Sequence, residues 1–281
     1  MLIVHTITEL RQLLQLAHEQ EKTIGFVPTM GALHFGHLSL VRACKKQCTI
    51  TVVSIFVNPT QFNNPDDLSN YPRDLKQDCD LLLASGADIV FAPDEKEMYP
   101  QPDTRRFSFG RLEKVMEGKY RPAHFNGVAQ VVSRLFEIVR PTYAYFGEKD
   151  FQQVAIVRSL ASQMGGHPTI IACPVVREAD GLAMSSRNTL LTDVQRAHAP
   201  LIAATLVQAQ AKTKKMTVDG LRQWVIDTIN ADDELEVEYA EIVDEQTLQA
   251  VGHWFEGVPT RLCVAVYARP VRLIDNIRLY P

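Results

Sequence analysis

Two histidines three residues apart, His34 and His37, are the first residues along the chain whose types and spacing suggest chemistry. They belong to residues 28–37 (PTMGALHFGH), which follow a short apolar run and lead into a segment with a helical pattern. A helix N-terminus offers free N–H groups and about half a positive charge, and Gly36 lets the backbone approach a ligand closely. Because imidazole rings donate hydrogen bonds in either protonation state, this segment predicts a site for phosphate oxygens.

Two further roles for the histidines stay open. They could form half of a metal site, although the sequence offers no third ligand nearby, or they could be structural histidines with satisfied hydrogen bonds. The spacing of Gly31 and Gly36 matches part of a P-loop but lacks the Gly-Lys pair of that motif, so we do not interpret it as one.

A second cluster follows another apolar run. Residues 146–153 (FGEKDFQQ) place a glycine and then Lys149 at the end of a predicted strand, where a helix begins. This arrangement suits a phosphate or ribose site. A plain turn with Asp150 as the N-cap of the helix explains it equally well.

Two more segments carry polar side chains on predicted loops. Residues 183–188 (AMSSRN) supply two hydroxyls and an arginine after Gly181, and could either close over a triphosphate or merely link two domains. In residues 57–62 (VNPTQF), amide side chains follow a strand and could orient a small polar substrate, although Asn58-Pro59 is also simply a good turn.

The elements that must position these clusters alternate between strand and helix over about 170 residues. The first helix begins with a Thr6/Glu9 capping box. The expected strands are 23–27, 50–57, 87–91, 142–146 and 169–173, and the other expected helices are 36–46, 75–84, 128–139 and 151–164. This alternation is typical of a parallel sheet with helices on both faces, in which ligands bind beyond the carboxyl ends of the strands.

The pattern changes after about residue 176. A second capping box, Thr192/Gln195, begins a long predicted helix that runs to about residue 214, and another helix is expected over 218–229. Alternating runs at 235–243, 261–267 and 271–279 then predict strands. The predicted fold class is therefore α/β: a doubly wound parallel-sheet (Rossmann-like) N-terminal domain, 1–175, with a smaller α+β C-terminal lid domain, 176–281.

Composition and net charge limit the classes of partner and function that the chain can have. The chain has 281 residues, 46% of them hydrophobic and 22% charged, with a net charge of −4, which argues against duplex DNA or an anionic membrane as the main partner but not against a small anionic ligand. The five cysteines are scattered without a zinc spacing. With no signal-peptide pattern and no apolar run of membrane-spanning length, we expect a cytoplasmic protein.

Together the clusters resemble one family, pantothenate synthetase (pantoate–β-alanine ligase), within the His-x-Gly-His nucleotidyltransferase group. The matching stretches come in the family's order and cover most of residues 25–190. They are PTMGALHFGH at 28–37, FVNPTQF at 56–62, YPRDL at 71–75, FGEKDFQQ at 146–153 and VVREADGLAMSSRN at 175–188.

The resemblance implies an enzyme that joins (R)-pantoate to β-alanine with ATP and Mg²⁺, releasing AMP and pyrophosphate through a bound pantoyl adenylate, and that is commonly a homodimer. It implies that His37, His34, Lys149 and Arg187 act on the phosphates. The implied ATP-binding residues are Met30, Gly31, His34, Gly36, His37, Gly147, Glu148, Lys149, Asp150, Val176, Met184, Ser185, Ser186 and Arg187. Gln61 and Gln153 would bind pantoate, and Asn58 and Gln61 would lie near β-alanine.

The residue types agree with such a reaction. A carboxylate attacking phosphorus is already ionised at neutral pH and needs no base, whereas bringing it to a polyanion requires positive donors. The amine of β-alanine must lose a proton before it attacks, and the sequence does not identify the base; His37 and the phosphate are candidates. Asp78, with Asp74 and Asp80 nearby, is a weak candidate ligand for Mg²⁺, and an ordinary acidic helix face explains these residues equally well.

Two rival functions remain. A nucleotidyltransferase that keeps the nucleotide on its product would release pyrophosphate but no AMP. A non-catalytic ATP-binding module would bind ATP without turnover. A tRNA-charging enzyme is a more distant third, because the chain is short and acidic.

Overall fold

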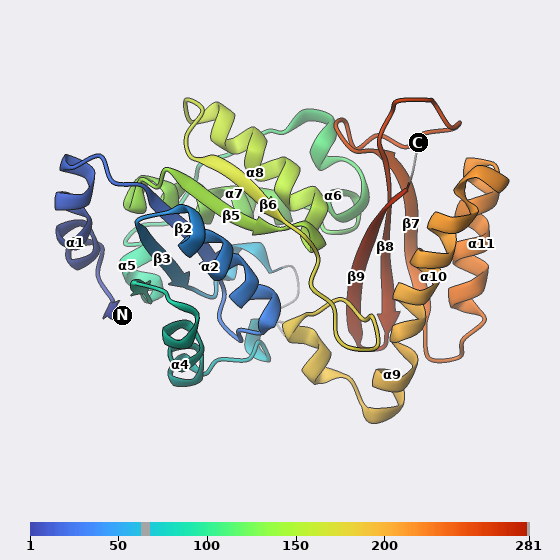
Figure 1. Cartoon of the computed structure of the whole chain (residues 1–281), viewed down its shortest axis with the longest axis horizontal. Helices are drawn as coiled ribbons and strands as arrows, with labels where there is room; N and C mark the ends of the chain where they lie inside the picture. Colours follow the sequence, from blue (N-terminus) through green and yellow to red (C-terminus); the bar gives the residue numbers. More distant parts are fainter. Residues whose placement is uncertain (63–67, 280–281) are drawn as a thin grey trace.

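The structure, a computed structural model, describes residues 1–62 and 68–279 and contains two sheets (Figure 1). The larger sheet has six parallel strands in the order β1-β4-β3-β2-β5-β6. In that spatial order the strands are β1 (Leu2–Val4), β4 (Ile89–Phe91), β3 (Ile50–Ile55), β2 (Ile24–Thr29), β5 (Tyr143–Gly147) and β6 (Thr169–Cys173). The strand order reverses between β2 and β5, which makes that junction the expected place for a ligand.

Helices cover both faces of this sheet, because successive strand residues point to opposite sides. On one face, α2 (Phe35–Gln47) and α4 (Leu75–Ser85) pack against Val27 and Val53. On the other face, α1 (Ile7–Glu19), α7 (His124–Val139) and α8 (Phe151–Gln163) pack against Phe26 and Val52. The short helices α5 (Glu95–Met98) and α6 (Met116–Tyr120) lie in the connection from β4 to α7.

The second sheet is antiparallel, in the order β7-β8-β9, with β7 (Glu236–Asp244), β8 (Thr260–Ala268) and β9 (Val271–Leu279). One face packs on α10 (Pro200–Lys212) and α11 (Val218–Asn230), with Leu262, Val264 and Val266 of β8 in that core. The alternate residues Cys263 and Ala265 face a second cluster that includes Met116 of α6. The small sheet therefore lies between its own helices and the first part of the chain (Figure 1).

This architecture confirms the predicted fold class, a Rossmann-like parallel sheet with a smaller α+β part. The prediction that the strand expected over 23–27 ends before Pro28 was wrong, because β2 continues through Pro28 to Thr29. Pro28 pairs in register with Ser54 of β3, whereas the pairing of β2 with β5 stops at Phe26. The missing N–H of Pro28 therefore costs no hydrogen bond on the β5 side.

Two helix predictions also need correction. The long helix expected from residue 192 is two helices, α9 (Asp193–His198) and α10, which begins at Pro200 as N1. Helix α7 begins at His124, four residues before the predicted start, and its N-cap Ala123 has φ +66° and no side-chain cap. The left-handed φ of Ala123 and its lack of a capping side chain both differ from the usual signals for the start of a helix. In the described part of the chain no helix is both long and apolar enough to cross a membrane.

Candidate active site

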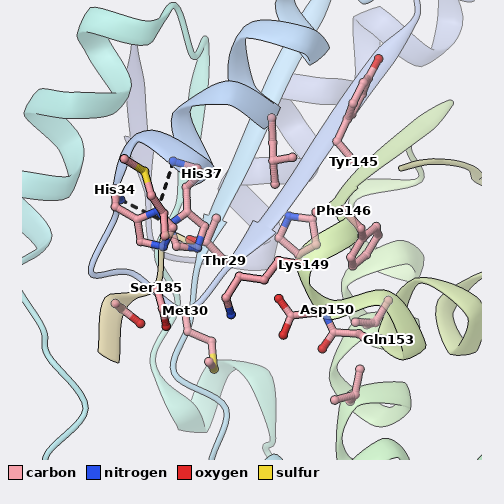
Figure 2. A pocket seen from close by; sticks show the side chains of 18 of the residues that line it. Thr29, Met30, His34, His37, Tyr145, Phe146, Lys149, Asp150, Gln153 and Ser185 are labelled. Carbon is pink, nitrogen blue, oxygen red and sulfur yellow. Dashed lines mark hydrogen bonds between the residues drawn. The ribbon is translucent and has the colours of Figure 1, made fainter. Parts of the chain in front are cut away.

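A cavity of about 220 Å³ opens at the carboxyl ends of the parallel strands, where their order reverses (Figure 2). Its walls come from the ends of β2 and β5 and from the segments that follow β3 and β6. One side of α7 also lines it. Among the described residues, all that line it precede residue 188. The predicted strand-end clusters thus meet in one space.

The two histidines lie side by side at the start of α2, with ring centroids 4.1 Å apart (Figure 2). The Gly36 N–H donates to Nδ1 of His34 at 3.1 Å, and the His34 N–H donates to Nδ1 of His37 at 3.4 Å. Because each Nδ1 accepts, each neutral ring carries its proton on Nε2. Both rings line the cavity, so each has a neutral N–H donor to offer there.

Burial keeps both rings neutral. It lowers the pKa of His34 to about 4, with the charge of Lys149 adding to the effect. Burial lowers the pKa of His37 further, to about 3, with His34 and then Lys149 as the next causes. At neutral pH the pair therefore donates hydrogen bonds without being charged.

The backbone before the histidines is held in an unusual shape by Asp78 of α4. Gly31 has φ +82° and Ala32 has φ +49°, which is uncommon for a residue with a side chain. The carboxylate of Asp78 accepts N–H groups from Ala32 at 3.0 Å and from Leu33 at 2.8 Å. Burial raises the pKa of Asp78, and these two hydrogen bonds oppose that shift. Asp78 thus fixes the loop that leads to His34.

Lys149 stands opposite the histidines in a short 3₁₀ turn, Glu148–Asp150, that connects β5 to α8. Lys149 and Asp150 both line the cavity, and Gln153 lies one turn further along α8 (Figure 2). Glu148 does not line it: its side chain turns toward Arg261 of β8, with a carboxylate-to-guanidinium distance of 3.5 Å.

The Ser-Ser-Arg loop closes another side. Ser185 caps a short 3₁₀ helix, Ser186–Leu190, by accepting the Arg187 N–H at 3.2 Å. The Met184 N–H donates to the Val176 carbonyl at 3.0 Å, which ties the loop to the segment after β6. The hydroxyls of Ser186 and Tyr71 lie 3.3 Å apart. The loop is therefore already folded against the cavity.

The remaining wall combines amides with apolar side chains. Gln61 follows β3, and its Nε2 lies 3.0 Å from the sulfur of Met30. Asn58 is 1% exposed, and its amide donates to Oε1 of Gln61 at 3.3 Å and to the Gly127 carbonyl at 3.2 Å, while its oxygen accepts from Tyr99 at 2.9 Å. Asn58 therefore orients Gln61. The apolar lining comes from Val128, Val131, Val132 and Leu135 of α7 and from Phe56.

Of the predicted site residues, three lie outside this cavity: Gly31, Glu148 and Asp78. Gly31 and Asp78 line a separate hollow behind the loop. All the other predicted site residues line the main cavity. They are Met30, His34, Gly36, His37, Asn58, Gln61, Gly147, Lys149, Asp150, Gln153, Val176, Met184, Ser185, Ser186 and Arg187.

Sequence reasoning missed several lining residues. Tyr71 lies in the YPRDL stretch, whose motif could have pointed to it. The α7 residues repeat at i, i+3, i+4 and i+7, a pattern that any buried helix shows, so the sequence carried no signal of a ligand there.

The described residues contain no group of three or more His, Cys, Asp or Glu side chains placed to hold a metal ion. Asp78 fits such a role poorly, because both its oxygens already accept backbone N–H groups.

The parallel sheet, with two histidines at a helix start, the turn that carries Lys149 and the Ser-Ser-Arg loop around one cavity at its carboxyl edge, defines a doubly wound α/β protein with a site suited to a nucleotide. Comparison with known proteins narrows this class. The sequence model of the pantoate-beta-alanine ligase family matches residues 2–278, and the chain therefore belongs to that family. The reaction of this family is the ATP-dependent joining of pantoate to β-alanine, as expected above.

Individual relatives agree. The chain is 50% identical to a pantothenate synthetase of Porphyromonas gingivalis over 98% of both chains, and 51% identical to one of Bacteroides fragilis over 99% of both. The crystal structure of pantothenate synthetase from Thermus thermophilus matches with a TM-score of 0.93 at 41% identity over 100% of both chains. A pantoate-beta-alanine ligase from Francisella tularensis, complexed with beta-gamma ATP and beta-alanine, matches with a TM-score of 0.83 at 35% identity, covering 99% of this chain and 97% of that one.

Proposed function

We propose that this protein condenses (R)-pantoate with β-alanine at the cavity between β2 and β5, through a bound pantoyl adenylate. The observation that carries the proposal is that one cavity is lined by two kinds of group. Hydrogen-bond donors and cations come from three loops, and amides come together with apolar α7 side chains. A triphosphate suits the first kind of lining, and a small hydroxy acid with two methyl groups suits the second.

In the first step, an oxygen of the pantoate carboxylate forms a bond to the α-phosphorus of ATP. The bond from that phosphorus to the bridging oxygen breaks, and pyrophosphate leaves. The Nε2–H groups of His34 and His37, with Lys149 and Arg187, stabilise the charge on the phosphates. Removing one such donor typically costs about 10²–10³ in rate.

We assign pantoate to the part of the cavity that the amides line. Gln61 and Gln153 bind its polar groups, and its two methyl groups pack against Val131 and Val132. Asn58 acts through Gln61, because its own polar atoms already have partners within the protein. β-Alanine then approaches the same carboxyl group from the side of Gln61.

In the second step, the ammonium group of β-alanine releases one proton to the solvent and the resulting amine attacks the acyl carbon. AMP leaves with the carbon–oxygen electron pair, and the nitrogen loses its second proton as the amide forms. His37 is poorly suited to be the base, since its Nδ1 lone pair accepts the His34 N–H and its Nε2 carries a proton. We therefore assign proton acceptance to an adenylate phosphate oxygen. The loop bearing Ser185 and Arg187 excludes water that would hydrolyse the adenylate.

We propose that Mg²⁺ enters with ATP and is held mainly by phosphate oxygens, as is usual for nucleotide enzymes. The absence of a three-residue metal cluster among the described residues supports this. A chelator should then abolish turnover without changing the melting temperature of the nucleotide-free protein.

We propose domain limits of 1–175 and 176–281. Strand β6 ends at Cys173, and the core under the small sheet begins with Leu182, which supports this division. From the family resemblance we also propose that the protein is cytoplasmic and a homodimer. Light scattering after size-exclusion chromatography would test whether it is a dimer.

Product analysis tests the proposed reaction. The protein is incubated with ATP, Mg²⁺ and pantoate, with and without β-alanine. We expect AMP and pantothenate together only when both acids are present. With both acids present, pyrophosphate without AMP would indicate a nucleotidyltransferase, and ATP binding without either product would indicate a binding module.

A further inference from the structure

The residues that line the cavity all come from the first 187 residues in the described part of the chain, yet two of its loops are held from behind by β9. The contacts come from two consecutive residues, Asp275 and Asn276, which are 4% and 3% exposed. Neither has a role in the reaction described above.

Asn276 holds the turn that carries Lys149. Its Nδ2 donates to the carbonyl oxygens of Glu148 and Lys149, each at 2.9 Å. Its Oδ1 accepts from Nη1 of Arg261 at 2.7 Å. Arg261 is itself fixed, by Glu245 at 2.8 Å and by the ring of Phe151, whose centroid lies 4.1 Å from the guanidinium carbon. The Asn276 amide therefore has both N–H groups and its oxygen engaged, and the lysine turn rests on a buried, rigid support.

Asp275 holds the start of the Ser-Ser-Arg loop. Its carboxylate accepts two hydrogen bonds from the guanidinium of Arg177, at 2.7 and 3.0 Å. Arg177 also donates to the Gly181 carbonyl at 3.0 Å, closing the turn that leads to Ser185, and its backbone pairs with Ala183. This two-bond geometry fixes orientation as well as distance.

Strand register sets the spacing of these two supports. Asp275 pairs with Val264 of β8 and Asn276 with Cys263, within a continuous antiparallel ladder of nine residue pairs. Because consecutive strand residues lie at a fixed separation, the lysine turn and the Ser-Ser-Arg loop cannot move apart without breaking a contact to β9.

We propose that Asp275 and Asn276 are positioning residues that set the placement of the two phosphate-contacting loops relative to each other. The proposal rests on the proposed function for its kinetic consequences. Its structural part concerns the loops alone and can be tested without turnover. Misplacing catalytic groups by about 1 Å can cost roughly 10²-fold in rate, so such support from outside the cavity matters for catalysis.

The competing hypothesis is that Asp275 and Asn276 only hold the two parts of the chain together. Different contacts already serve that purpose. Arg272 of β9 pairs with Glu117 of α6 at 2.7 Å, and the Tyr239 hydroxyl donates to the same carboxylate at 2.8 Å. Tyr239→Phe therefore provides a control that weakens adhesion without touching either loop.

The test compares Asn276→Ala and Asp275→Asn with two controls, Tyr239→Phe and Gln195→Ala. Gln195 is a matched buried amide, 8% exposed, that donates to the Arg269 carbonyl at 2.7 Å within the C-terminal part. Amide hydrogen exchange is measured first, on the ligand-free proteins. Steady-state kinetics with ATP, pantoate and β-alanine are then measured well below the melting temperature. Asn276→Asp, which keeps the shape but loses both N–H donors, is used if the alanine variant does not fold.

We expect faster exchange over residues 147–151 in Asn276→Ala and over 177–188 in Asp275→Asn, with kcat/KM for ATP falling roughly 10²-fold in each. The controls should lower the melting temperature but leave loop exchange and kinetics unchanged. Loop exchange and kinetics equal to those of the controls would overturn the proposal. If the parent protein makes no pantothenate, the proposed function fails, and the exchange result still decides the structural part.

Discussion

At the scale of single residues, the histidine pair shows how a motif can offer hydrogen-bond donors without carrying charge. Two backbone N–H groups fix the rings with Nε2 protonated, and burial with Lys149 nearby keeps them neutral. A permanently charged pair so close together would cost repulsion in the empty site. The neutral rings avoid that cost and still present two donors.

This arrangement predicts an asymmetry between two substitutions of His37. The amide nitrogen of a glutamine can lie near the position of Nε2, whereas that of an asparagine lies near Nδ1. We therefore expect His37→Gln to keep more activity than His37→Asn, which should lose about 10²–10³ in kcat. Steady-state kinetics with saturating ATP measure both. Equal losses would show that the Nε2 donor is not what the reaction uses.

Asp78 predicts a different outcome depending on whether it holds the loop or a metal ion. Asparagine can accept only one of the two N–H groups, from Ala32 or Leu33, so Asp78→Asn should loosen the loop and lower kcat roughly 10²-fold. The Mg²⁺ concentration that gives half-maximal rate should stay unchanged. A Mg²⁺ titration of the variant measures this, and a large rise in that concentration would make Asp78 a metal ligand after all.

At the scale of elements, the part of the cavity that Asn58 and Gln61 line depends on the close approach of a helix and a turn. The 3₁₀ turn Pro59–Gln61 lies directly on α7 at Gly127. A Cβ at residue 127 would lie 2.3 Å from the carbonyl oxygen of Thr60 and 2.9 Å from Cα of Gln61. Contacts this short involve backbone atoms and cannot be relieved by turning a side chain.

Gly127→Ala should therefore displace Gln61 while leaving the histidines in place. We expect the KM for pantoate to rise about 10-fold or more, by loss of roughly one good hydrogen bond, with a smaller change in the KM for ATP. Gly252→Ala serves as the control, because a Cβ there has no neighbour within 4 Å. Parallel rises in both KM values would indicate general damage to the site.

The elements also show what local pattern can and cannot predict. Buried strands such as β3 and helices such as α2 follow from β-branched runs and periodicity, and many of the polar residues after them line the cavity. The direction of Glu148 depends on Arg261, more than a hundred residues away, and the role of Asp78 depends on a loop packed against its helix. Such tertiary contacts leave no periodic trace in the sequence.

At the scale of the whole molecule, buried neutral histidines make the fold sensitive to acid. Burial lowers the pKa of His124 to about 4, as it does for His34 and, to about 3, for His37, against an ordinary value of 6.5. Between pH 6.5 and about 4 the unfolded chain takes up protons that the folded chain does not. The free energy of unfolding should therefore fall as the pH drops through this range.

Asparagine at residue 124 tests this linkage, because its amide can still donate to the Gln61 carbonyl as Nδ1 of His124 does at 2.9 Å. We expect urea unfolding of His124→Asn to depend less on pH than that of the parent, by at most about 1.4 kcal/mol per pH unit between pH 6 and 4.5. Parallel curves would show that His124 is protonated in the folded protein.

The support given by β9 also has a consequence for the order in which the protein is made. A chain that has left the ribosome as far as residue 230 contains every described residue that lines the cavity. It still lacks the strand on which the lysine turn and the Ser-Ser-Arg loop rest, since Asp275 and Asn276 are translated later. On the proposal above, full competence for nucleotide chemistry should arrive with the final strand, and a nascent chain without it should turn over ATP far more slowly than the finished protein.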